Sequence, residues 1–188
     1  MEKEEQIIDE TLKLFFKNGI RHYTLDDISK ALGISKATLY QYFKDKAEFI
    51  EKVINYHIEN TRCDMHEIGE DADALTVMIH VYQYLSKKYS EIHPFFFEDI
   101  EKFYPDVWKK MTSFRKLHIF SNIKSNLIQG KKEGVYREDL NEDILSGMFL
   151  KIIETGIHFK EISEINIMYS PTEIYKNMFL YHIYGILN

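Results

Sequence analysis

Apolar residues recur at helical spacing along nearly the whole chain, and this periodicity restricts the fold more than any other feature of the sequence. Between Ile7 and Phe16 they follow the pattern of a helix with one buried face, and Asn18 and Gly19 then supply residues suited to a left-handed helix end. The strict alternation of apolar and polar residues that is typical of strands is hard to find. With only three prolines and eight glycines in 188 residues, the sequence predicts an all-α protein.

Capping residues and helix breakers divide the chain into about nine helices. Thr24, followed three residues later by Asp27, can cap the second helix through a weaker form of the capping box. Gly33 ends that helix, and Ser35 and Asp45 can cap the next two. The expected ranges are about 7–18, 25–32, 36–43, 46–65, 71–90, 94–102, 106–130, 141–160 and 171–187.

Residues 24–46 contain two short helices separated by a short turn with a glycine, which is the arrangement of a helix-turn-helix. Gly33 permits the positive φ that a sharp turn can require. The apolar underside expected to pack the two helices together consists of Ile28, Leu32, Ile34, Leu39 and Phe43. The alternative is a helical hairpin inside an ordinary bundle, but such a hairpin does not require the two tyrosines and three lysines of residues 36–46.

The other side of the second short helix is polar and suits the major groove of DNA. Gln41 can pair with adenine through two hydrogen bonds, and the methyl group of Thr38 can contact thymine. Lys46 lies in the first turn of the next helix, where a cation opposes the helix dipole, so a phosphate contact would explain its position. The candidate DNA-binding residues of this segment are Lys36, Thr38, Tyr40, Gln41, Tyr42 and Lys46.

The distribution of charge agrees with a protein that touches nucleic acid at one end only. The net charge is −6, yet residues 1–46 hold eight basic and eight acidic side chains, so the whole excess lies in residues 47–188. Within residues 30–46, four lysines stand against Asp45 alone. A small basic segment on an acidic body is typical of proteins that bind phosphates through a local patch.

The segment GISKATLYQYFKDK, residues 33–46, resembles the DNA-binding domain of the tetracycline-repressor (TetR) family. Gly19, Thr24 and the Asp27–Ile28 pair fall in the same register, and the likeness runs over residues 7–49, about a quarter of the chain. Ser29 and Tyr23 depart from the family's usual residues, but neither lies on the recognition helix. Many positions match at fixed spacing, so the resemblance is specific.

The resemblance implies an Ω-shaped homodimer with a three-helix DNA-binding domain at residues 1–46 and a larger helical effector-binding and dimerisation domain at residues 47–188. It places Thr24 near a phosphate, beside the six candidates above, and Gln41 is the residue best suited to recognising a base. A small apolar or aromatic effector would release a repressor from a pseudo-palindromic operator. The long helix 46–65 would then act as the lever between the two parts.

The position of the effector pocket is less clear from the sequence. Residues 95–108 form a dense aromatic cluster, which can be either core packing or the wall of a pocket. Positions carried over from the family give Phe96, Trp108, Met111, Phe114, His118, Met148, Ile152 and Tyr175 as candidates. Glu154 and His158 lie one turn apart and can serve as a polar anchor or as a solvated or interfacial pair.

The last two expected helices carry broader apolar surfaces than the core of a monomer requires, which favours dimerisation through a four-helix bundle. The candidate interface residues are Ile144, Met148, Ile152, Ile174, Met178, Tyr181 and His182.

Other classes of function find little support in the sequence. The chain lacks a nucleophile elbow, a phosphate-binding glycine loop and a paired-carboxylate motif, so we expect neither an enzyme nor a cofactor, although an all-α active site can lack local motifs. Cys63 and His66 form the only close Cys/His spacing, and we expect no metal site. A charged N-terminus and the lack of a long apolar run predict a cytoplasmic protein without a membrane partner. The main rival is a small-molecule-binding helical protein that has lost operator binding.

Overall fold

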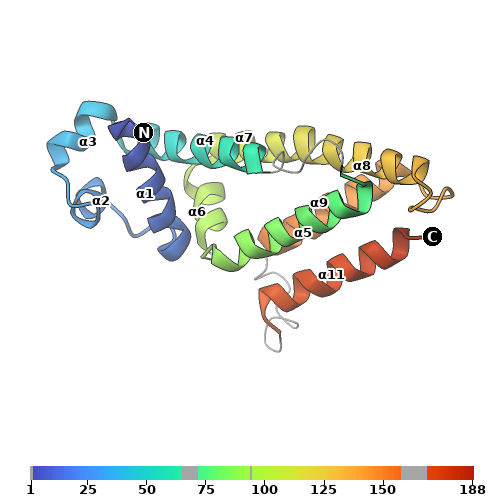
Figure 1. Cartoon of the computed structure of the whole chain (residues 1–188). Helices are drawn as coiled ribbons and strands as arrows, with labels where there is room; N and C mark the ends of the chain where they lie inside the picture. Colours follow the sequence, from blue (N-terminus) through green and yellow to red (C-terminus); the bar gives the residue numbers. More distant parts are fainter. Residues whose placement is uncertain (1, 65–71, 94, 158–168) are drawn as a thin grey trace. The chain divides into compact units, whose positions relative to one another are not determined.

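The structure, a computed structural model, describes residues 2–64, 72–93, 95–157 and 169–188 (Figure 1). These residues contain no β-strand and one isolated bridge, between Tyr136 and Leu187, and the all-α prediction is confirmed. The chain divides into two compact units, Met1–Asp64 with Ile92–Lys110 and Met65–Glu91 with Met111–Asn188. We call the first the head unit and the second the body unit. The functional boundary expected after residue 46 stays a prediction.

The helices of the head unit are α1 (Lys3–Asn18), α2 (Leu25–Ala31), α3 (Lys36–Tyr42), α4 (Lys46–Asp64), α6 (Phe95–Phe103) and the first part of α7 (Pro105–Phe114). Helices α2, α3 and α4 begin directly after the capping residues expected from the sequence, whereas α1 begins at Lys3, before the expected residue 7, and has no side-chain cap. Thr24 and Asp27 form a complete capping box at α2, with the Asp27 amide donating to Thr24 Oγ1 at 3.2 Å and the Thr24 amide to Asp27 Oδ2 at 2.9 Å. Ser35 caps α3 by accepting from the Thr38 amide at 3.0 Å. These side chains satisfy amides that have no partner inside a helix.

The core of the head unit joins the helix-turn-helix to α1 and α4. Ile28 and Leu39 are fully buried, and the rings of Phe43 and Phe49 lie 4.4 Å apart between centroids. On the other side of α1, Phe16 packs edge-on against Phe96 of α6 at 5.0 Å. The same apolar spacing that predicts the helices therefore also supplies their contacts.

The body unit consists of packed helices: α5 (Ala74–Glu91), the end of α7, η1 (Arg115–Ile119), α8 (Phe120–Lys132), α9 (Glu142–Ile157) and α11 (Pro171–Ile186). Helices α5, α9 and α11 lie side by side (Figure 1), and α8 packs against α5 and α9. Tyr136 is buried against Gly130 of α8, and its hydroxyl donates to the Ala74 carbonyl at 3.0 Å. None of the helices in the described ranges is long and apolar enough to cross a lipid bilayer.

The prediction of a continuous α-helix over residues 106–130 is wrong at one point. Residues Arg115–Ile119 form a π-helical turn between α7 and α8. Five buried residues of this run within the body unit are spaced by four: Met111, Arg115, Ile119, Ile123 and Leu127. Asn126 and Gly130, near the end of the run, are buried as well. Four residues of an α-helix turn by about 400°, so such a series drifts by about 40° per step. The π-helical turn holds one extra residue, so each of its residues rotates less about the helix axis. This offsets much of the drift and keeps the five residues facing inward.

Smaller differences concern helix ends. The expected range 106–130 ends at Gly130, but α8 continues through Gly130 to Lys132, and Gly134 has a positive φ of 72° after the helix. Asp73 caps α5, with the Thr76 amide donating to Asp73 Oδ1 at 2.8 Å. The first positions of the expected helices 71–90 and 94–102, and the last three of 141–160, lie outside the described residues.

Candidate nucleic-acid interface

Helix α3 turns its apolar side into the head unit. Leu39 and Phe43 are buried, and Leu32 and Ile34 are half-buried beside them. Gly33 has a φ of 66°, which supplies the tight turn between α2 and α3. The helix is therefore held from below, and its other side faces solvent.

The solvent side of α3 carries the side chains expected from the sequence. Tyr40 is 49% exposed, Lys36 and Gln41 are exposed, and Thr38 and Tyr42 are half-buried. The hydroxyl groups of Thr38 and Ser35 lie 2.8 Å apart. An amide, hydroxyls and a cation on one accessible helical face can meet base edges and phosphates.

Sequence reasoning missed a partner of Lys36. Its ammonium group lies 2.8 Å from the Asp26 carboxylate of α2, and this hydrogen bond raises the pKa of Lys36. Asp26 and Lys36 lie on different helices, ten positions apart, so no local spacing in the sequence marks them as partners. A DNA phosphate must share or displace this carboxylate to reach Lys36.

Thr24 and Lys46 differ in how freely they can meet a phosphate. Thr24 is exposed, although its hydroxyl also hydrogen-bonds Asp27 Oδ2 at 2.5 Å. Lys46 is half-buried, and burial lowers its pKa, while the nearby carboxylates of Asp99 and Asp27 act in the opposite direction. The ammonium group of Lys46 therefore interacts with carboxylates inside the head unit, which the helix-dipole argument did not predict.

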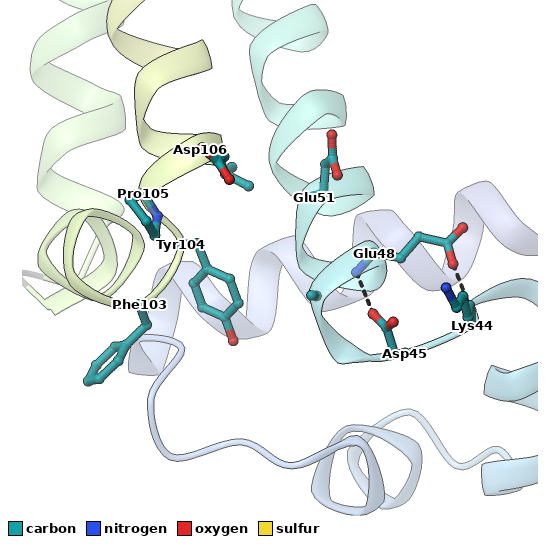
Figure 2. A pocket seen from close by; sticks show the side chains of 10 residues that line it. Lys44, Asp45, Glu48, Glu51, Phe103, Tyr104, Pro105 and Asp106 are labelled. Carbon is teal, nitrogen blue, oxygen red and sulfur yellow. Dashed lines mark hydrogen bonds between the residues drawn. The ribbon is translucent and has the colours of Figure 1, made fainter.

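A groove of about 490 Å³ adjoins the start of α4, between α4 and the junction of α6 and α7 (Figure 2). Its carboxylates come from Asp45, Glu48, Glu51 and Asp106. Figure 2 shows two of them engaged in capping α4: Asp45 accepts from the Glu48 amide at 2.9 Å, and Glu48 accepts from the Lys44 amide at 2.8 Å. Because four carboxylates and one lysine, Lys44, line this groove, we expect it to repel DNA phosphates rather than bind them.

The sequence is similar to that of known transcriptional regulators. The model of the family described as bacterial regulatory proteins, tetR family, matches residues 7–53. The chain is 25% identical to the HTH-type transcriptional regulator YvaF of Bacillus subtilis, over 94% of this chain and 86% of that protein. It is 41% identical to IcaR, the negative transcriptional regulator of the biofilm operon icaADBC of Staphylococcus epidermidis, over 29% of this chain and 32% of that protein.

Solved structures share the fold over the whole length. A transcriptional regulator from Saccharomonospora viridis in complex with choline aligns with a TM-score of 0.78 at 16% identity, over 98% of this chain and 97% of that one. A TetR-family regulator from Rhodococcus sp. aligns with a TM-score of 0.74 at 15% identity, over 100% of both chains. At these identities the likeness concerns the fold alone.

Residues 7–53 therefore form a DNA-binding domain of the TetR type, and the described chain has the fold of solved TetR-family regulators. The curated relatives are transcriptional regulators, and this chain is a DNA-binding transcriptional regulator and not an enzyme.

The structure distributes the candidate TetR-family effector residues between the two units. Phe96 is fully buried in the head unit, where it contacts Phe16 and His57, so it is part of the core. Trp108, also in the head unit, is half-buried. In the body unit, Met111 is buried, and the rings of Phe114 and His118 lie 4.9 Å apart with His118 exposed.

The remaining effector candidates lie on α9 and α11. Tyr175 is buried, and its hydroxyl donates to the Ile153 carbonyl at 2.9 Å. Met148 and Ile152 line a groove between α9 and α11. The eight candidates are therefore not brought together in one described cavity, and the location of the effector site stays a prediction. His158 lies outside the described residues, as does His66, and the side chain of Cys63 is likewise not described.

Most candidate interface residues gather on the same two helices of the body unit. The groove between α9 and α11 has a volume of about 710 Å³, and Met148, Ile152, Met178, Tyr181 and His182 line it. Ile144 is 64% exposed and Tyr181 is 82% exposed. Ile174 is half-buried. Sequence reasoning missed Tyr184, which lines the groove and is 73% exposed; its place one turn after Tyr181 on α11 could have marked it.

Proposed function

We propose that this TetR-family regulator is a cytoplasmic homodimeric repressor, which binds a pseudo-palindromic operator and is released from it by a small apolar or aromatic effector. The observation that carries the proposal is the solvent face of α3, where Tyr40 and Gln41 are exposed on a helix anchored by Leu39 and Phe43. A helix that is already anchored presents its polar side chains to a groove without the entropy cost of becoming ordered on binding.

Within this face, base recognition and phosphate contact fall to different residues. Gln41 is exposed and can pair with adenine through its amide. Lys36, Thr24 and Lys46 are suited to phosphates, which position the head without specifying sequence. The tyrosines Tyr40 and Tyr42 can add hydroxyl contacts to the backbone, and Thr38 can contact a thymine methyl group.

Dimerisation through α9 and α11 is the second part of the proposal. Large apolar side chains rarely stay in water as a contiguous patch unless a partner covers them. Ile144, Met148, Tyr181 and Tyr184 are all at least half exposed on these two helices. Two copies packed through this face would form a four-helix bundle and place two recognition helices on half-sites about 34–36 Å apart.

Release by an effector is the third part. The Saccharomonospora viridis regulator binds choline, and IcaR is a negative regulator; both support a repressor that responds to a small molecule. An effector that lowers affinity for the operator must itself bind less tightly to the operator complex, by the same factor. Helix α4 connects the helix-turn-helix to the rest of the chain and is the element we propose as the lever.

The proposal is tested by fluorescence anisotropy with duplex DNA from upstream of the protein's own gene and with a random duplex of equal length. We expect salt-dependent binding that favours the upstream DNA. Gln41→Ala should cost about 1–3 kcal/mol and relax the preference for one base, because it removes a base contact. Lys36→Ala should weaken binding to all sequences and reduce the slope of log affinity against log salt by about 1.

Both substituted side chains are exposed, so alanine leaves the packing of α3 intact. Lys132→Ala in α8 is the matched control, since it removes an exposed lysine from the body unit. Equal binding of upstream and random DNA by the wild type, unchanged by Gln41→Ala, would contradict operator recognition by α3. It would instead favour a ligand-binding protein that has lost this function.

A further inference from the structure

Asp99 of α6 is a buried carboxylate whose described hydrogen-bond partners lie in the turn between α1 and α2. Its side chain is 0% exposed. Oδ2 accepts from the Ile20 amide at 2.8 Å and from the Arg21 amide at 2.7 Å, and Oδ1 accepts from Arg21 Nε at 2.7 Å. Ionised carboxylates are buried only when charge and hydrogen bonds compensate for lost water, and here two backbone amides and a guanidinium do so.

Arg21 holds more than one residue of α6. Its guanidinium carbon lies 4.1 Å above the centre of the Phe95 ring, and its Nη2 is 3.3 Å from Glu98. The side chain thus spans the first turn of α6 with a cation–π contact, one buried ion pair and one exposed ion pair. Arginine can make all three because its planar group combines stacking with several directed donors.

The turn itself is shaped for this close approach. Gly19 has a φ of 78°, and a Cβ there would lie 3.3 Å from Asp99 Oδ2 and 3.4 Å from Phe95 Cβ. Just before the turn, the Phe16 carbonyl accepts from the His93 amide at 2.6 Å. A side chain at position 19 would both strain the backbone and crowd the carboxylate, so the turn and α6 are fitted to each other.

We infer that Asp99 is a positioning residue for operator binding, which acts through Arg21 to fix the orientation of the helix-turn-helix relative to α6. The inference rests on the proposed binding of two half-sites by a dimer. Arg21 precedes Thr24, the N-cap of α2, by three residues, so fixing residues 20 and 21 fixes where α2 and α3 begin. Helix α6 continues through Tyr104 into α7, which leads along the chain to the body unit.

The chemistry of the contact predicts a specific defect. A head released from Asp99 keeps its recognition helix, because Asp99 forms no described hydrogen bond with a DNA-binding candidate. Its charge does act on Lys46, but a change at Lys46 affects each head alike and therefore the half-site as well as the full operator. The released head loses a defined orientation, so the two heads of a dimer meet both half-sites less often. Binding to one half-site should be retained, whereas the gain from simultaneous engagement of two should fall.

The experiment compares one duplex that carries a full operator with another that carries a single half-site, at low salt. The wild type should bind the full operator more tightly than the half-site. In Asp99→Asn we expect half-site affinity to stay within about twofold and full-operator affinity to fall at least about tenfold, equivalent to about 1.4 kcal/mol. Glu101→Gln is the matched control, since it removes one negative charge from an exposed position of the same helix, and it should keep the wild-type ratio.

Each outcome bears on the inference. Equal losses on both duplexes would show a purely structural role, and an unchanged ratio would show no role; either overturns it. If Asp99→Asn does not fold, Arg21→Lys replaces it, because lysine keeps the charge but loses the Nε bond and the stacking. A wild type without preference for the full operator contradicts the proposed dimeric binding itself, and this result is visible before any variant is measured.

Discussion

Replacing Gly130 with alanine should destabilise the body unit because the new methyl group would collide with a buried ring. A Cβ at this position would lie 2.1, 2.3 and 2.8 Å from three ring atoms of Tyr136, whereas carbon atoms pack at about 3.5–4.0 Å. The ring has little room to move away, since Tyr136 is 1% exposed and its hydroxyl donates to the Ala74 carbonyl at 3.0 Å and to Asn126 Oδ1 at 3.2 Å.

The expected magnitude follows from three contributions. Overpacking costs about 1–3 kcal/mol, and separation of the buried Tyr136 hydroxyl from its acceptors costs about 1–3 kcal/mol more. The higher helix propensity of alanine offsets about 0.8–1 kcal/mol of this. The net loss in the free energy of unfolding is therefore about 3 kcal/mol for Gly130→Ala.

Gly147 of α9 provides the matched control, because a Cβ there meets nothing within 4 Å. Gly147→Ala should stabilise the protein by about 0.5–1 kcal/mol, the opposite sign for the same chemical change. Urea unfolding followed by circular dichroism at one protein concentration measures both, since association would otherwise shift the midpoint. Equal midpoints for the two variants would refute the packing of Tyr136 against Gly130.

Three further perturbations probe the head and the groove. Asp26→Asn should raise affinity for DNA several-fold at low salt and less at high salt, because it removes the competitor for Lys36; weaker binding would contradict this. The free energy of unfolding should fall as the pH drops from about 7 to 5, because burial lowers the pKa of His182 from 6.5, so that the unfolded chain takes up the proton first. His182→Leu should remove that part of the pH dependence in urea titrations, and an unchanged dependence would exclude His182 as its source. Thr24→Ala should cost about 1 kcal/mol through loss of the α2 cap, and an unchanged urea midpoint would show that the capping box adds no stability.

The helix-turn-helix could be predicted from the sequence because its determinants are local. Thr24, Ser35 and Gly33 act on residues within three or four positions, and the structure contains the corresponding caps and the positive φ. The apolar spacing that buries Leu39 also leaves Gln41 outside. Sequence neighbours therefore determine both the fold of this segment and the side chains that it exposes.

Contacts between distant residues could not be predicted in the same way. Arg21 and Asp99 are 78 positions apart, and nothing in either neighbourhood marks the other as its partner. Hydrophobicity also does not distinguish a core from a pocket, so Phe96 was a pocket candidate although it is fully buried against Phe16. The location of an effector cavity depends on how helices diverge, which composition does not encode.

The π-helical turn of η1 has a consequence for how the chain can change in length. An insertion into a regular α-helix rotates every later side chain by about 100° about the axis, but here the wide turn already contains such a residue. Leu117, which is exposed, lies between the buried residues 115 and 119. Its deletion would shorten that one interval of the buried series from four residues to three and leave the other three intervals at four. That is the spacing of an ordinary amphipathic helix. This turn is therefore the point at which the helix could lose one residue and still present the same buried side chains.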